Sequence, residues 1–112
     1  MKALVLLLIG ALFGFHLFSR IIKNKPTVKT SIIFHALFVL GGLAFLFITW
    51  ANTESQLLNM SLIFLVLAAL GGMTMVFLDV VKKIKPPSIL AVGHMLLALT
   101  GVTILVVYLF GQ

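Results

Sequence analysis

The chain has 112 residues, of which 62% are hydrophobic and 9% are charged, and its mean hydropathy is +1.31. Soluble domains carry about a quarter charged residues, so this composition excludes an ordinary soluble domain. The formal net charge of +6, in a chain this apolar, indicates orientation in a membrane and not nucleic-acid binding. Because the chain has no cysteine, it has no disulfide, no thiolate metal site and no cysteine nucleophile.

Four apolar runs, separated by short polar breaks, predict four transmembrane helices. They cover about residues 3–22, 30–51, 56–81 and 88–110, and each reaches the ~20 residues that a helix needs to cross the hydrocarbon layer. The first run resembles a signal sequence, but no small-residue cleavage site follows it, so we expect an uncleaved span. Because the connections are short, the prediction is one all-α integral membrane domain, residues 1–112, an up-down-up-down four-helix bundle.

Seven of the eight basic residues flank two of the three connections, and the eighth is Lys2. The first connection has Arg20, Lys23, Lys25 and Lys29, and the third has Lys82, Lys83 and Lys85, whereas the loop at residues 52–55 has none. The positive-inside rule then places both basic connections in the cytoplasm and both termini outside. We therefore expect an integral membrane protein, in a bacterial inner membrane.

The second and fourth predicted helices are introduced by nearly the same sequence. Residues 23–42 and 83–101 each contain a Lys-x-Lys-Pro corner, then a histidine in an apolar run, then a glycine seven residues after that histidine. A helical hairpin repeated in the same orientation implies a pseudo-twofold axis along the membrane normal. The second and fourth helices are then diagonal partners, and we expect His35 and His94 to face each other across the centre.

Each predicted helix contains one ionisable residue toward its cytoplasmic end, and these are His16, His35, Asp79 and His94. Ionisable side chains inside a membrane are costly and are candidates for function. Asp79 lies four residues before Lys83, an order that favours an ion pair on a helix, so we expect it to pair with Lys83 or Arg20.

Histidines on two facing helices resemble the four-helix haem bundles of membrane b-type cytochromes, in which such histidines ligate haem and glycines let the porphyrin approach the backbone. The resemblance implies one haem b in the cytoplasmic half, with His35 and His94 as its axial ligands. It also implies packing positions at Gly14, Gly42, Gly72 and Gly101, and propionate-neutralising lysines at Lys23, Lys25, Lys83 and Lys85. Thr49 and Tyr108 stand where larger members have second histidines, so one haem is implied.

The implied function is electron transfer, with the lipid bilayer as surroundings and a quinone or a redox partner protein as electron partner; a homodimer is also compatible. The sequence admits two other interpretations. One is binding or transport of a transition metal, copper or zinc, by His16, His35 and His94, with His16 as an alternative ligand. The other is a non-catalytic membrane subunit or assembly factor whose histidines form hydrogen bonds between helices. Because no hydrolytic motif is present, enzymatic activity is left open.

Overall fold

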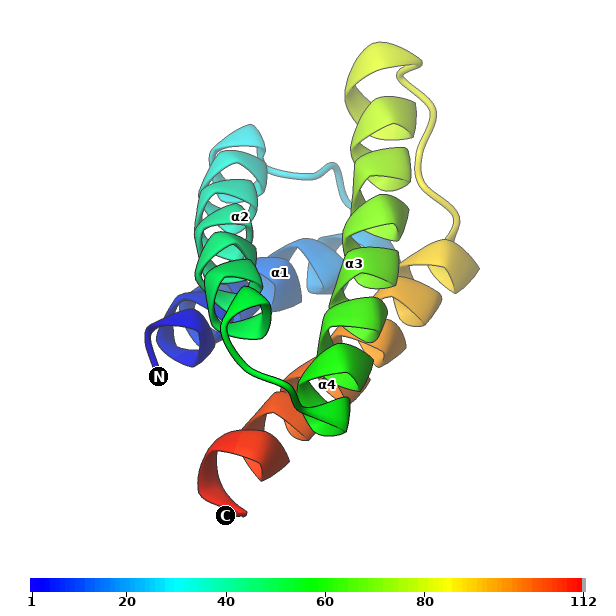
Figure 1. Ribbon diagram of the computed structural model, residues 1–112. Helices are drawn as coiled ribbons and strands as arrows, with labels where there is room; N and C mark the ends of the chain where they lie inside the picture. The colour runs from blue at the N-terminus through cyan, green and yellow to red at the C-terminus, as the bar shows by residue number, and fades with distance from the viewer. Residues whose placement is uncertain (112) are drawn as a thin grey trace.

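The computed structural model describes residues 1–111, which form four long helices joined by short connections (Figure 1). The helices are α1 (Lys2–Ile22), α2 (Lys29–Ala51), α3 (Gln56–Val76) and α4 (Ser88–Phe110), and a five-residue π-helix, η1 (Phe77–Val81), extends α3. The prediction of an all-α chain with four long helices is confirmed. By length and composition all four can cross a membrane, α3 and η1 together forming one span of 26 residues.

The helix ends follow from local chemistry. At the end of α1, Asn24 adopts a left-handed conformation with φ 58°, and the amide of Lys25 donates to the carbonyl of Arg20 at 2.9 Å. This is the Schellman arrangement that closes many helices, and Pro26 then prevents continuation. At the start of α3, the Ser55 hydroxyl accepts a hydrogen bond from the amide of Leu58 at 3.3 Å, as an N-cap serine does.

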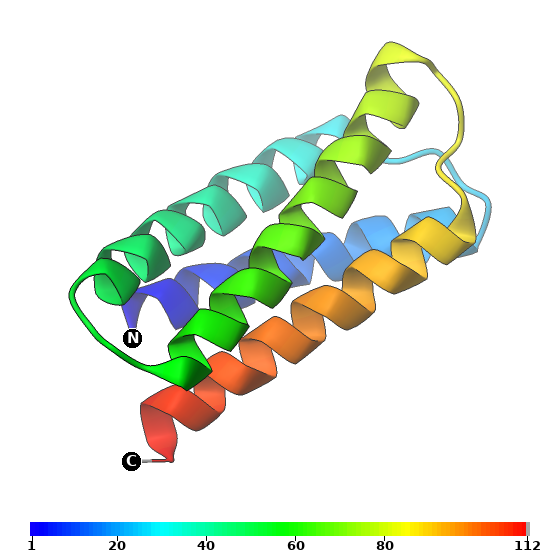
Figure 2. The same cartoon turned by 45° about the vertical axis from the view of Figure 1, so that its right-hand side comes forward.

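Consecutive helices are antiparallel and form two hairpins, α1–α2 and α3–α4, shown side by side in Figure 2. Within each hairpin the helices pack closely, whereas contacts between the hairpins are sparse. α1 lies beside α4 and α2 beside α3, while α2 and α4 have no close backbone contact. The helices that carry His35 and His94 are therefore diagonal in the bundle.

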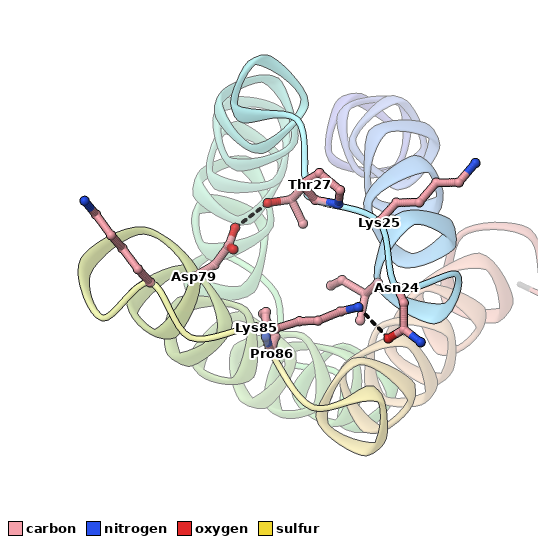
Figure 3. Close-up of a pocket in the computed structure, with 9 residues that line it drawn as sticks. Asn24, Lys25, Thr27, Asp79, Lys85 and Pro86 are labelled. Carbon is pink, nitrogen blue, oxygen red and sulfur yellow. Dashed lines mark hydrogen bonds between the residues drawn. The ribbon is translucent and has the colours of Figure 1, made fainter.

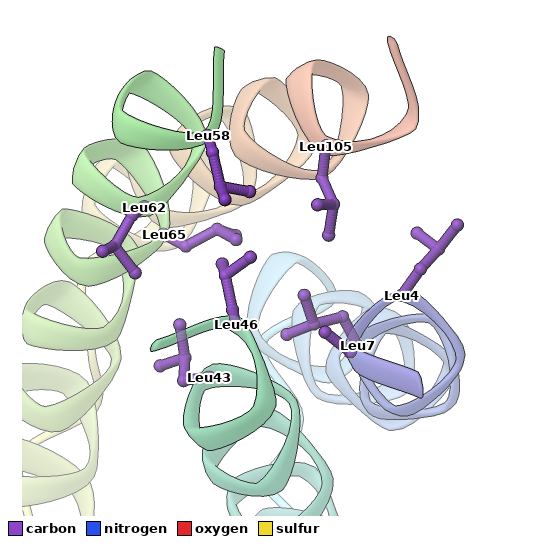
Figure 4. Packing of buried hydrophobic residues seen from close by; sticks show 9 residues of the cluster. Leu4, Leu7, Leu43, Leu46, Leu58, Leu62, Leu65 and Leu105 are labelled. Carbon is purple, nitrogen blue, oxygen red and sulfur yellow. The ribbon is translucent and has the colours of Figure 1, made fainter. Parts of the chain in front are cut away.

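The hydrophobic core occupies the end of the bundle that holds both chain termini, here called the leucine end (Figure 4). Leucines from all four helices meet there: Leu4, Leu7, Leu43, Leu46, Leu58, Leu62, Leu65 and Leu105. The opposite end, with the connections at residues 23–28 and 82–87, is here called the basic end. Between the two histidines and the basic end, Ile21 is the only large hydrophobic side chain buried among the described residues. The hairpins are thus joined mainly at the leucine end.

The outward surface of the helices is apolar. Leu12 is 73% exposed, Phe15 69% and Ile89 83%, and similar side chains cover the other helices. A surface of this kind suits lipid tails and agrees with the length and hydropathy of the four helices.

Candidate functional site

His35 on α2 and His94 on α4 face each other across the bundle. The centroids of their rings lie 6.2 Å apart, and the ring planes are inclined at 76°. Both side chains are half-buried. The diagonal placement of α2 and α4 therefore brings together the two histidines that occupy matching places in the sequence.

Each of these rings is oriented by a backbone carbonyl of the other helix in its hairpin. Nδ1 of His35 lies 2.7 Å from the carbonyl oxygen of Gly10, and Nδ1 of His94 lies 2.6 Å from that of Ala68. A carbonyl oxygen only accepts hydrogen bonds, so Nδ1 carries the donated proton in each ring. In the neutral imidazole Nε2 then holds the lone pair, which is the usual state of a metal-ligating histidine.

Two glycines make room for the imidazole rings. A Cβ on Gly14 would lie 2.7 Å from Cε1 of His35, and a Cβ on Gly72 would lie 3.1 Å from Cε1 of His94. The first distance is too short for any side chain, so α1 approaches His35 as closely as it does only because residue 14 is glycine. The family resemblance implies packing positions at both glycines, and in the structure both lie against the histidines.

The glycines seven residues after the histidines lie elsewhere, within the leucine core. A Cβ on Gly42 would lie 2.7 Å from Cγ of Leu7, and a Cβ on Gly101 would lie 2.6 Å from Cγ of Leu65. The space beside each glycine is filled by a leucine of the neighbouring helix. In the structure these two glycines permit close helix packing. That they also help to hold a cofactor remains a prediction.

His16 does not join the pair. It lies on the exposed side of α1, and its Nδ1 is 2.9 Å from the hydroxyl oxygen of Ser31 on α2. Among residues 1–111, no three histidine, aspartate or glutamate side chains are grouped so that they could hold a metal ion. The convergence that a three-histidine metal site requires is therefore not found in the described part of the chain.

The two basic corners meet at the basic end around a cavity of about 340 Å³ (Figure 3). Residues of both corners line it, among them Asn24, Lys25, Thr27, Asp79, Lys83 and Lys85. The Thr27 hydroxyl donates to the Asp79 carboxylate, and the Lys85 ammonium donates to the Asn24 amide oxygen. Figure 3 shows the Lys85 side chain extending toward Asn24, whereas Lys25 points away from the cavity. Both hydrogen bonds connect one hairpin to the other.

The expected ion pair of Asp79 is not formed, and this corrects the sequence analysis. Asp79 accepts from Thr27, while Nε of Arg20 donates to the carbonyl of Pro26 at 2.7 Å. The expectation assumed α-helical spacing between Asp79 and Lys83, but Asp79 lies in the π-helix, and Lys83 has left the helix with φ 55°. The sequence did not predict the π-helix or the hydrogen bond from Thr27 to Asp79. The one feature of the sequence that indicated a polar contact in this helix was Asp79 itself.

Comparisons of the chain with protein-family models, with curated proteins and with solved structures find no match. The class that the fold and the site define is a four-helix bundle, apolar enough to span a membrane, with two imidazoles paired between diagonal helices in the half nearer the basic end. Any functional assignment rests on the chemistry of those residues.

Proposed function

We propose that the protein is a small membrane b-type cytochrome that binds one haem between α2 and α4 and serves in electron transfer. The observation that carries this proposal is the facing pair of imidazoles, each with Nδ1 donating to a backbone carbonyl. A metal ion binds an imidazole nitrogen at about 2.0–2.1 Å. When two imidazoles bind one metal from opposite sides, the centres of their rings therefore lie roughly 6 Å apart. The observed separation of 6.2 Å suits such a metal.

The number of available ligands favours haem over a bare metal ion. Structural zinc sites take about four ligands from the protein, whereas haem iron already has four ring nitrogens and needs only axial ligands from the chain. The described residues offer two facing histidines and no third histidine or carboxylate grouped with them. Haem supplies a one-electron iron couple, and the protein supplies ligation, orientation and electrostatics.

The packing of the bundle favours a cofactor in the half nearer the basic end. The leucine core fills the other half, whereas Ile21 is the only large hydrophobic side chain buried on the basic side of the histidines in the described residues. Lys83 and Lys85 of the second corner line the cavity and provide positive charge that attracts the propionates of a haem. Lys25, which was expected to do the same, points away from the cavity (Figure 3).

We also propose that the two hairpins are a structural repeat related by a pseudo-twofold axis along the membrane normal. Three kinds of contact recur in support of it: a carbonyl at each histidine Nδ1, a glycine beside each ring, and a leucine on each later glycine.

The positive-inside rule places the basic end in the cytoplasm and both termini outside, in a bacterial inner membrane. A quinone or a redox partner protein then exchanges electrons with the haem.

The visible spectrum of the protein purified in detergent tests the haem proposal. We expect a sharp Soret band, and resolved α and β bands on reduction, because two imidazoles complete the coordination of the iron. His35→Ala and His94→Ala should abolish these bands. His16→Ala is the matched control and should keep them, because His16 lies on the exposed face of α1.

The other results of this experiment separate the alternatives. A colourless protein that retains copper or zinc would replace haem by a bare metal ion. A preparation that stays colourless and free of metal after haem is added would leave only a structural role for the histidines. Loss of the spectrum in His16→Ala, with His35→Ala unaffected, would contradict the assigned ligands.

A further inference from the structure

The cavity at the basic end keeps a carboxylate and an ammonium apart. Asp79 and Lys85 both line it, yet each is held by a neutral partner on the opposite hairpin, Thr27 and Asn24. In the described residues the two charges form no ion pair with each other. Figure 3 shows the Lys85 side chain directed away from Asp79. A ligand that carries both an anion and a cation can therefore meet both charges.

Neither hydrogen bond has to break for such a ligand to bind. A lysine ammonium has three donors, so Lys85 can keep its bond to Asn24 and donate to a second acceptor. An ionised carboxylate has about four acceptor sites, so Asp79 can keep Thr27 and accept from a second donor. Lys83, which also lines the cavity, adds a second positive charge for an anion.

The cavity lies at the level where a phospholipid headgroup would be found. The apolar spans end or begin beside it, at Ile22, Val81 and Ser88. Its volume of about 340 Å³ is at the lower end of the ~300–1,000 Å³ typical of small-ligand sites. Beside the second corner, Val81 is 64% exposed and Ile84 55% exposed, which provides apolar surface for acyl chains. Basic pockets at the cytoplasmic ends of membrane helices are known to bind lipid headgroups.

We infer that this cavity binds a phosphate diester that carries a primary ammonium, the headgroup of phosphatidylethanolamine. The phosphate meets Lys85 and Lys83, and the ammonium meets Asp79. A glycerol headgroup has no cation and leaves the negative charge of Asp79 near the phosphate. A choline headgroup has no N–H to donate. His35 and His94 do not line the cavity, but Lys85 is shared with the haem proposal, so the two proposals need separate tests.

Native mass spectrometry of the protein in detergent tests the inference. The protein is titrated with phosphatidylethanolamine, phosphatidylcholine and phosphatidylglycerol, and the lipid-bound fraction is measured. We expect phosphatidylethanolamine to bind roughly tenfold more tightly than either other lipid, the effect of one charge-assisted contact. The titration is repeated with His35→Ala, in which no haem competes for Lys85. This comparison of lipids on the unmodified chain does not depend on any variant of the cavity.

Two substitutions test which side chain binds the ammonium of the headgroup and which binds its phosphate. Asp79→Asn should remove the preference for phosphatidylethanolamine, because its cationic group loses its partner. Lys85→Met should weaken the binding of all three lipids, because each carries the phosphate. Two controls should leave the binding of all three lipids unchanged. They are Glu54→Gln, the other acidic residue, in the loop at the leucine end, and Lys2→Met, a basic residue at the leucine end and outside the cavity lining.

Soluble glycerophosphoethanolamine, the same phosphate diester without acyl chains, distinguishes the two sources of this group. If it binds as tightly as the lipid, the cavity recognises the free group without acyl chains; if only the lipid binds, the source is the membrane. Equal affinity for the three lipids in the unmodified protein would overturn the inference. So would a preference that survives in Asp79→Asn, or lipid binding that Lys85→Met leaves unchanged.

Discussion

One backbone carbonyl and one glycine set the position of each imidazole ring. The carbonyls of Gly10 and Ala68 orient the rings through Nδ1, and in membrane proteins such an interhelical bond contributes only about 0.6 kcal/mol on average. Overlap with a misplaced atom costs more than loss of that bond. The space left by Gly14 is therefore expected to matter more for the ring of His35 than the hydrogen bond does.

Gly14→Ala should displace the ring of His35. Its Cβ would lie 2.7 Å from Cε1 of the imidazole, and overpacking of this kind lowers the free energy of unfolding by about 1–3 kcal/mol. If haem is bound, its spectrum should weaken or shift as well. The measurement is unfolding of the purified protein by titration with a denaturing detergent, followed by circular dichroism.

Gly93→Ala is the matched control for this substitution. A Cβ at Gly93 meets no atom within 4 Å, and alanine is favoured over glycine inside a helix by about 1 kcal/mol. The control should leave stability unchanged or raise it. Equal losses in the two variants would show that helix propensity or handling, and not contact with the ring, governs the effect.

At the scale of the helices, the two hairpins differ at one buried hydrogen bond. The hydroxyl of Ser61 on α3 is fully buried and donates to the carbonyl of Gly101 on α4 at 2.8 Å. In the proposed repeat the matching position of the first hairpin is Ala3, which packs against Gly42 with no side-chain hydroxyl. The second hairpin thus has one polar contact that the first does not.

Ser61→Ala should destabilise the protein by about 0.6 kcal/mol, the average for interhelical hydrogen bonds in membrane proteins, and by at most about 1.7 kcal/mol. Thr100→Ala is the control, because Thr100 is exposed and its hydroxyl donates to Leu96 within the same helix. Stability is measured by detergent-titrated unfolding, as for the glycine variants. A loss in Thr100→Ala as large as in Ser61→Ala would argue against an energetic role for the bond between α3 and α4.

The π-helix accounts for a difference in length between the hairpins. From Gly14 to the left-handed Asn24 is ten residues, whereas from Gly72 to the left-handed Lys83 is eleven. A π-turn holds one residue more than an α-turn, so η1 absorbs the extra residue without moving the helix that precedes it. Asp79 lies in this π-helix and accepts a hydrogen bond from Thr27 on the other hairpin.

At the scale of the whole molecule, the two ends of the bundle have different roles. The leucine core joins the hairpins at one end. At the other end a small cavity lies between them, and two hydrogen bonds connect the hairpins beside it. Because seven of the eight basic residues lie at the cavity end, the positive-inside rule predicts one orientation of the bundle in a membrane.

Labelling of single cysteines tests this orientation, and the natural absence of cysteine removes any background. Glu54→Cys lies in the loop at the leucine end and Ile84→Cys in the second basic corner, and both positions are exposed. We expect a membrane-impermeant maleimide to label Glu54→Cys in intact bacterial spheroplasts. Ile84→Cys should be labelled only after the membrane is permeabilised; the reverse pattern would invert the orientation.

Much of the fold is determined by the sequence alone. Four apolar runs of spanning length, interrupted by proline corners and a capping serine, leave a chain of this size no other way to satisfy its backbone in lipid. His35 and His94 occupy matching positions in the second and fourth helices, which run parallel in an up-down-up-down bundle, so the sequence predicts that they lie on diagonal helices at similar depth. In the structure they face each other. These conclusions depend only on helix length, period and polarity, which are local properties.

Only the tertiary structure decided which atoms meet. It placed Gly42 and Gly101 among leucines, His16 against Ser31, and Asp79 against Thr27 in place of an ion pair. It also brought the two corners around one cavity. Such contacts join residues up to 61 positions apart, and they depend on how each helix is rotated about its axis. A single π-turn changes that rotation by roughly 100°, which the periodicity of an apolar run does not reveal.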